Sequence, residues 1–253
     1  MHHLISLANS DNPLPLLLYA MAFFFLIYCT FAGMVFLFAK QVNRPIEKRL
    51  VTSRQLATEL VNSMRSIILF GIGMIVPWLL IQNGYATIIA KVSSMQILLE
   101  CVALILWNDL HFYIVHRLLH TQFNKPQFKW LNLKPAHITH HKSISATPFA
   151  AYSMSITEAL LLGSIMPIAM LVWDFSAFSL LFLPVWSIAI NALAHSNCDF
   201  FPHAAQRSCF GLVKHHQSHH SHYHGNYSFF FWQLDAYLGT LRHSTIQDTH
   251  DTI

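Results

Sequence analysis

Three short clusters of histidine in this sequence have the spacing of metal ligands. His116 and His120 are four residues apart, which places both imidazoles on one face of a helix. Two later segments repeat the pattern H-x-x-H-H, and we expect each set to direct two or three imidazoles at a common point. Imidazole binds iron, copper, zinc and nickel. We therefore predict a site for more than one metal ion with eight ligands: His116, His120, His137, His140, His141, His216, His219 and His220.

The alternative for any one of these residues is ordinary packing. A lone histidine is more often a hydrogen-bonded core residue than a ligand, and a histidine-rich run is often a solvated surface. Three clusters, two of which repeat one pattern, favour metal binding. The same reasoning gives no metal role to the histidines near the chain ends, which are His2, His3, His243 and His250. It leaves open the roles of His203, His215, His222 and His224, and His215 could replace His216 in register.

The composition predicts an integral membrane protein. The chain has 253 residues, of which 54% are hydrophobic and only 10% are charged, whereas soluble domains carry about 25% charged residues. The formal net charge of +4 does not require a nucleic-acid partner, and no nucleic-acid-binding motif is present. The four cysteines have no paired spacing, so no disulfide framework is expected.

Five apolar segments are candidates for membrane-spanning helices, since about 20 apolar residues cross the hydrocarbon core. They cover residues 13–39, 66–81, 95–120, 154–173 and 177–194. Pro77 is expected to kink the second segment, and residues 82–84, Gln-Asn-Gly, predict a turn after it. A four-span variant, in which one of the earlier segments is misread, is the alternative.

The distribution of basic residues predicts the orientation of the bundle. Cytoplasmic loops are enriched in Lys and Arg. If residues 40–65 lie inside, five spans also place 116–150 and 195–253 inside, together with every Lys and Arg except Lys91. All proposed ligands then lie on the cytoplasmic side. The expected fold is an all-α, multi-span membrane helical bundle with a cytoplasmic histidine-rich di-metal site.

Polar residues on the third apolar segment extend the predicted site. Asp109, Tyr113, His116 and His120 follow one helical stripe. We interpret Asp109 and Tyr113 as catalytic candidates, because the hydroxyl of Tyr113 could orient a ligand. His111 is off this stripe and is expected at the membrane interface. Carboxylates commonly orient ligand imidazoles through the second ring nitrogen, and the candidates for this are Asp109, Glu158, Asp199 and Asp235.

Longer motifs carry a resemblance to a known family. They are D-L-H-F-Y-I-V-H-R-L-L-H (109–120), K-P-A-H-I-T-H-H-K-S-I-S-A-T-P-F-A (134–150), H-S-N (195–197), H-H-Q-S-H-H-S-H-Y-H-G-N-Y (215–227) and L-D-A-Y-L-G-T (234–240). The chain resembles the fatty acid hydroxylase superfamily of membrane di-iron enzymes, in its sterol desaturase branch. The T-P-F-A segment is similar to sterol C-5 desaturases. Departures from the family pattern are Ser155 in place of a histidine, Leu234 in place of a tryptophan, and Cys198-Asp199.

The resemblance implies a function and further site residues. It implies that His195 is a ninth ligand, that the cofactors are two iron ions, which zinc can replace, and that dioxygen is a co-substrate. Asn226 is then a candidate for holding a metal-bound water. The implied reaction is hydroxylation or desaturation of a sterol-like or fatty-acyl lipid, with electrons from a separate reductase chain. The membrane would be the bacterial inner membrane or the endoplasmic reticulum.

The expected organisation has three parts, which are N-terminal spans with a basic loop (1–107), the catalytic region (108–240) and a tail (241–253) whose last eleven residues we expect to be frayed. Two other classes of function stay open. A membrane metal-binding or metal-transport protein would distribute its ligands along the spans, whereas here they flank the spans. A membrane metallohydrolase is disfavoured because the sequence lacks H-E-x-x-H.

Overall fold

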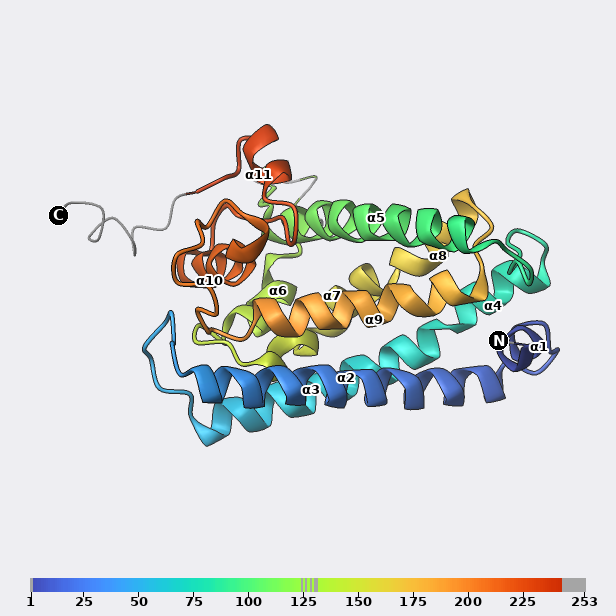
Figure 1. Ribbon diagram of the computed structural model, residues 1–253, viewed down its shortest axis with the longest axis horizontal. Helices are drawn as coiled ribbons and strands as arrows, with labels where there is room; N and C mark the ends of the chain where they lie inside the picture. Colours follow the sequence, from blue (N-terminus) through green and yellow to red (C-terminus); the bar gives the residue numbers. More distant parts are fainter. Residues whose placement is uncertain (1, 124, 126, 128, 130–131, 243–253) are drawn as a thin grey trace.

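A computed structural model describes residues 2–123, 125, 127, 129 and 132–242. Within these residues the regular structure is helical, and the chain forms an elongated bundle (Figure 1). Residues 243–253, which include His243, His250 and the tail predicted to be frayed, lie outside the described part, as do the side chains of His2 and His3. The predicted all-α class is confirmed.

Four helices of the described chain are long and apolar enough to cross a membrane. They are α2 (Leu14–Val42), α3 with α4 (Ser53–Gly73 and Ile75–Gln82), α5 (Ser94–His120) and α9 (Ala177–Ala194). Side-chain caps define where three of them begin, because Thr52, Ser93 and Ser176 each accept a hydrogen bond from a backbone N–H in the first turn. The predicted spans 13–39, 95–120 and 177–194 correspond closely to α2, α5 and α9.

The second span begins at Ser53, well before the predicted residue 66. The prediction was wrong because the early turns of α3 carry polar residues, which we assigned to a loop. Glu59 and Ser63 are buried against the protein interior and do not face lipid. The predicted kink is confirmed, since α3 ends at Gly73 and α4 begins at Ile75, just before Pro77. A proline ring clashes with the carbonyl four residues earlier, which here is that of Gly73.

The fourth predicted span is two short helices, α7 (Ile156–Gly163) and α8 (Ile165–Val172), which meet at Ser164. Together they form an apolar segment that is shorter than the four long helices. In Figure 1, α2, α5 and α9 run toward the end of the bundle where α10 (Leu212–His222) lies, whereas α3–α4 and α7–α8 run away from it. The chain therefore passes along the bundle five times, although only four passes are long single helices or a kinked pair.

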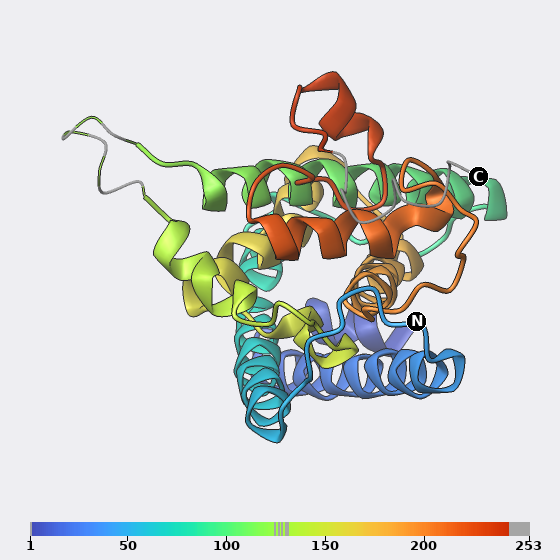
Figure 2. The same cartoon turned by 90° about the vertical axis from the view of Figure 1, so that its left-hand side faces the viewer.

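Shorter elements cover the end of the bundle that carries the histidines. Figure 2 faces this end, where α6 (Lys134–His141), α10 and α11 (Gln233–Tyr237) lie beside the ends of α5 and α9. The 3-10 turns η2 (Pro148–Tyr152) and η3 (Cys209–Gly211) belong to the same connections. Helix α1 (His2–Ala8) lies at the opposite end (Figure 1).

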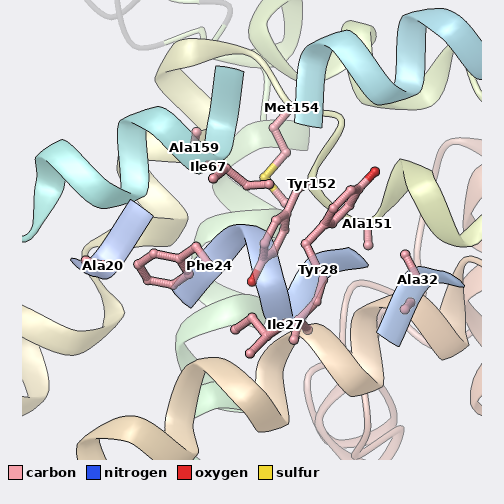
Figure 3. Packing of buried hydrophobic residues seen from close by; sticks show 12 residues of the cluster. Ala20, Phe24, Ile27, Tyr28, Ala32, Ile67, Ala151, Tyr152, Met154 and Ala159 are labelled. Atoms are coloured by element: carbon pink, nitrogen blue, oxygen red, sulfur yellow. The ribbon is translucent and has the colours of Figure 1, made fainter. Parts of the chain in front are cut away.

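The main apolar core joins α2, α3, η2 and α9 beneath the histidines. Figure 3 shows the rings of Tyr28 and Tyr152 side by side, with centroids 5.7 Å apart and planes 15° apart. The Tyr28 hydroxyl donates to the carbonyl of Phe149 at 2.9 Å. Alanines at fully buried positions, including Ala32 and Ala151, let the backbones approach closely. This core fixes η2, and with it the chain that follows α6.

Candidate metal centre

Nine buried histidines form two groups at one end of the bundle. The first group contains His116, His120, His137, His141 and His219. The second contains His140, His195, His216 and His220. Within each group the ligand nitrogens lie within 4.8 Å of one another. These nine are the same residues that the sequence and the family resemblance suggested as ligands.

Each H-x-x-H-H motif places two of its three rings in one group, as expected, and the third ring in the other group. In α6, His137 and His141 belong to the first group and His140 to the second. In α10 the roles are reversed, with His216 and His220 in the second group. Residues i and i+4 lie about 40° apart around a helix, whereas i+3 points about 80° away from their mean direction. One such helix can therefore supply two adjacent sites.

The Nε2 atoms of the first group converge on a point next to His141. The Nε2 atom of His141 lies 3.0 Å from that of His137, 3.2 Å from that of His120 and 3.0 Å from that of His219. An Nε2 atom carries either one proton or one lone pair, so it cannot hydrogen-bond to three others. Ligands bonded at 2.0–2.1 Å to one ion are about 2.9–3.4 Å apart. The spacing therefore fits a shared cation.

The second group has the same spacing around His195. Its Nε2 atom lies 3.0 Å from that of His140 and 3.0 Å from that of His216, which in turn is 3.2 Å from that of His220. His195 follows the last residue of α9. The end of a membrane helix therefore completes a group whose other members come from α6 and α10. Both sets of donors fit a metal ion that accepts imidazole nitrogen.

Where Nδ1 of a histidine in the two groups has a hydrogen-bond partner, that partner is in most cases a backbone carbonyl. Nδ1 of His116, His195 and His219 lies 2.9, 2.8 and 2.7 Å from the carbonyl oxygens of Tyr227, Asn191 and Gly225, respectively. That of His140 lies 3.3 Å from the oxygen of Ser153. A carbonyl only accepts, so Nδ1 must carry the proton and Nε2 keeps its lone pair. Sequence reasoning, which considered carboxylates alone for this role, missed these four contacts.

Burial keeps the ligand histidines neutral. It lowers the pKa of His137 and of His219 to about 3, and that of His140 to about 4. The pKa of His141 also lies well below its ordinary range, because burial and then the neighbouring imidazoles disfavour a charge. Metal ions bind the neutral ring. The lone pairs are therefore available to a cation at neutral pH.

One of the four candidate carboxylates touches a ligand ring. Glu158 lies 2.8 Å from Nδ1 of His137, and both side chains are buried. Asp235 instead contacts His215, and Asp199 pairs with Lys214 at 3.3 Å. Ser155, which replaces a family histidine, accepts the N–H of Glu158 and begins α7. The N-cap at Ser155 therefore fixes the first turn of α7, which carries Glu158.

Two of the other carboxylates, Asp109 and Asp235, accept hydrogen bonds from a loop that carries two of the orienting carbonyls. Asp109 accepts from the N–H groups of Phe230 and Phe231, at 2.5 and 2.9 Å. Asp235 accepts from the N–H groups of Tyr227 and Ser228, both at 2.8 Å, and from the hydroxyl of Thr240 at 2.6 Å. These bonds hold residues 227–231 against α5 and α11, and thereby support the carbonyls that face two of the rings.

The suggested catalytic residues lie behind the imidazoles. The hydroxyl of Tyr113 lies 3.0 Å from the Thr240 hydroxyl and accepts from Arg117 at 3.0 Å. The side-chain oxygen of Asn226 accepts the N–H of Arg242 at 2.8 Å. With Asp109, they hold the C-terminal loop in place. The structure thus brings the nine suggested ligands together and places the three suggested catalytic side chains in supporting positions.

The remaining histidines lie outside both groups. His215 bonds to Asp235, whereas His216 belongs to the second group. His203, His222 and His224 are exposed. His111 is buried, and its Nε2 lies 3.1 Å from the hydroxyl of Ser164. The expectation that His111 sits at the membrane interface was wrong, because it faces a polar helix junction inside the bundle.

An apolar cavity of about 250 Å³ lies within the bundle next to this centre. A small hollow directly beneath the imidazoles is lined by His116, His137, His140 and His195, among others. The cavity and the hollow share four lining residues, which are Phe112, Met154, Leu162 and Asn191. The cavity is therefore adjacent to the hollow beneath the histidine groups.

Comparison with known proteins identifies similar chains. Cholesterol 25-hydroxylase of Homo sapiens is 29% identical over 142 residues, which cover 54% of this chain and 49% of the relative. Cholesterol 25-hydroxylase of Rattus norvegicus is 30% identical over 153 residues, covering 58% and 48%, respectively. This chain thus spans about half the length of the curated relatives that it matches. No solved structure matches the chain.

A family model named Fatty acid hydroxylase matches residues 101–240, which is more than half of the chain. The matched region contains all nine histidines of the two groups, together with Glu158 and the loop that Asp235 holds. It also begins and ends near the limits of the motifs that carry the resemblance. The chain belongs to the fatty acid hydroxylase family.

Proposed function

We propose that this protein is a membrane-bound, metal-dependent hydroxylase of a lipid that contains sterol-like or fatty-acyl structure. The observation that carries the proposal is the apolar cavity next to a hollow that four of the nine buried imidazoles line. The names of the relatives support hydroxylation over desaturation, and a sterol over an acyl chain. Ligands gathered at one end of the bundle argue against the alternative, a metal-transport protein.

The donor set favours two iron ions, one in each group of imidazoles. Iron bound there would supply the activation of dioxygen, which zinc cannot supply because it has no redox chemistry. In the overall reaction one oxygen atom enters a C–H bond of the lipid and the other leaves as water. The balance requires two electrons and two protons, and we propose that a separate reductase chain delivers the electrons.

The residues of the chain position the substrate and exclude water. Phe112, Met154 and Leu162 form an apolar boundary between the cavity and the hollow beneath the imidazoles. Two further lining residues, Val76 and Leu160, are 44% and 56% exposed on the outside of the bundle. The cavity can therefore be reached from lipid between α4 and α7. This route avoids water, and exposing each buried CH₂ would cost about 0.8 kcal/mol.

We place the metal centre on the cytoplasmic side, in the bacterial inner membrane or the endoplasmic reticulum. The basic segment between α2 and α3, which carries Arg44, Lys48 and Arg49, lies at the same end of the bundle as the imidazoles. Basic loops favour the cytoplasmic side. A soluble or peripheral reductase could reach the centre from there.

The proposal is tested by measuring metal content and lipid conversion for the same purified protein. Protein from iron-replete cells should hold about two metal ions per chain, and should convert cholesterol when supplied with dioxygen and a reductase system. His116→Ala should abolish conversion while the bundle stays folded. His203→Ala, which changes an exposed histidine outside both groups, is the matched control.

Two outcomes would contradict the proposal. Full conversion by folded His116→Ala protein would remove the oxygenase interpretation, and metal transport would then become the better hypothesis. Two metals retained after the combined change of His120 and His140 to alanine, one from each group, would show that the histidine groups are not the metal sites.

A further inference from the structure

Polar side chains line one part of the otherwise apolar cavity. Asn108 and His111 of α5 are three residues apart and therefore lie on one face of the helix. Asn191 of α9 lines the same cavity nearer the imidazoles. The three side chains are only 5–6% exposed. They are buried groups that neither the metal centre nor the lipid-facing surface of the bundle explains.

The two amides lack hydrogen-bond partners within the part of the chain that the structure describes. Asn108 and Asn191 make no side-chain hydrogen bond there, and neither amide is among the fully enclosed polar atoms without a partner, so both amides reach the cavity that they line. Burying a polar group without a hydrogen-bond partner is unfavourable. Leucine or valine would avoid this cost at either position. The amides are therefore best explained by a polar partner that enters the cavity.

The imidazole of His111 adds an acceptor of defined chemistry. The hydroxyl of Ser164 donates to the carbonyl of Leu161 at 2.7 Å, so its oxygen must accept from Nε2 of His111. Nε2 then carries the proton, and Nδ1 keeps a lone pair. Asn108 supplies both an N–H donor and a carbonyl acceptor beside it. A hydroxyl group, which donates one hydrogen bond and accepts others, matches this pair of side chains.

The pair lies at a distance from the metal centre. Asn108 precedes His116 by eight residues and His111 precedes it by five, which corresponds to about 12 and 7.5 Å along the helix axis. A group bound here is therefore remote from the carbon that faces the imidazoles.

We propose that Asn108 and His111 form a subsite for a hydroxyl group of the lipid, remote from the carbon that is oxidised. The subsite anchors the substrate and sets which carbon reaches the imidazoles. This inference rests on the proposed function and narrows the substrate to a lipid that already carries a hydroxyl. A plain hydrocarbon chain would leave both side chains unpaired and would bind more weakly.

The test uses matched probes with and without a hydroxyl. One pair is cholesterol and its analogue that lacks the ring hydroxyl, and a second set is 1-alkanols of increasing length with the matching alkanes. Thermal stabilisation by each probe and conversion of each probe are both measured on the metal-loaded protein in lipid nanodiscs. The alcohol length with the largest hydroxyl preference measures the distance from the subsite to the reacting carbon.

Asn108→Leu and His111→Phe remove the hydrogen bonds at nearly constant volume. Each should reduce the preference for the hydroxylated probe about tenfold, which is the effect of one buried hydrogen bond of about 1.4 kcal/mol. Binding of the matched hydrocarbons should not change. Met166→Leu alters an apolar residue of the same cavity and should keep the full preference. Metal content verifies that each variant is folded, because none of these residues belongs to the histidine groups.

The two proposals fail in different ways. Hydroxyl-dependent binding that is lost in both variants supports the subsite, even if no probe is converted and the proposed oxidation is wrong. A hydroxyl preference that survives in both variants overturns the subsite, and so does a wild-type protein without any preference. In these last cases the amides bind only buried water. If Asn108→Leu does not fold, His111→Phe decides alone.

Discussion

At the scale of single residues, protein groups behind the imidazoles determine whether Nε2 is available. Four backbone carbonyls and one carboxylate accept from Nδ1, which fixes the ring orientation and the tautomer. The carboxylate of Glu158 is the one among them that a side-chain substitution can remove directly. A carbonyl can be moved only through the hydrogen bonds that hold its loop.

Glu158→Gln should weaken metal binding in the first group of imidazoles. An amide cannot stabilise the proton on Nδ1 of His137 as a carboxylate does, and such changes lower metal affinity about ten- to a hundredfold. Metal content after dialysis against a chelator measures the effect. Glu47→Gln, in the loop before α3, is the matched control and should retain the metal. Equal retention by both variants would show that Glu158 does not support the metal ligand.

Asp235→Asn tests the loop that carries two orienting carbonyls. Burial alone would raise the pKa of Asp235, but hydrogen bonds from His215, Ser228 and Thr240 lower it to about 2. A lowered pKa contributes stability above the unfolded value of about 4, and this contribution is lost as the pH falls toward 2. We therefore expect a loss of about 2–3 kcal/mol that does not vary between about pH 5 and pH 8.

Thermal unfolding of the wild type and of Asp235→Asn at several pH values measures this difference. Asp11→Asn, at an exposed position near the N-terminus, provides the control. A difference in stability that disappears toward neutral pH would contradict the low pKa of Asp235. A metal content that falls with the same substitution would show that the loop supports His116 and His219 through its carbonyls.

At the scale of elements, α3 is the support for the chain that follows α6. The side chain of Gln55 donates to the carbonyl of Ser145 at 2.9 Å, and Arg65 donates to that of Met154 at 2.6 Å. The hydroxyl of Ser63 donates to the carbonyl of Phe149 at 2.8 Å. This face of α3 thus holds residues 145–154, which include the carbonyl that orients His140. The position of α3 depends in turn on its contact with α2.

Gly71→Ala should loosen that contact. A Cβ atom at Gly71 would lie 2.1 Å from Cγ of Met21 and 3.2 Å from its Cα, so α2 and α3 must separate. Overpacking of this kind costs about 1–3 kcal/mol. Thermal unfolding in detergent or lipid measures the effect, with Gly33→Ala as the control because a Cβ there meets no atom within 4 Å. Equal stability of the two variants would show that α2 does not pack closely on α3.

At the scale of the whole molecule, five passes of the chain place all ligands at one end. An odd number of passes should put α1 on the side of the membrane opposite to the imidazoles. In a cysteine-free background, Ser6→Cys and Lys48→Cys should therefore react with an impermeant thiol reagent from opposite sides. Both positions are exposed, and they lie at opposite ends of the bundle.

Val172→Cys tests whether the short pair α7–α8 makes a complete pass. Val172 ends α8 and is 79% exposed. It should react from the same side as the cysteine at position 6. Reaction from the side of position 48 would mean that α7–α8 enters the membrane and returns without crossing it, and that the chain does not make five passes.

The sequence alone determined the helical class, most of the spans and eight of the nine histidines that form the two groups. Apolar runs of about 20 residues have few structures available to them in lipid, since a helix satisfies all of its own backbone groups. The i and i+4 spacing of His116 and His120 likewise fixes a shared helix face before any folding is considered. Such local signals do not depend on which segments meet in space. His195 has no such local signal, and it was added from the resemblance to a family.

The tertiary structure decided how the ligands are divided and what supports them. Whether His140 joins His137 or His195 depends on where α6 lies relative to α9, and no local pattern contains that information. The orienting groups of His116 and His219 are backbone carbonyls of a distant loop, which side-chain identity cannot reveal. His111 and the early turns of α3 were misplaced for the same reason. A polar residue within an apolar helix shows only that it has a partner, and the fold decides whether that partner is water, lipid or protein.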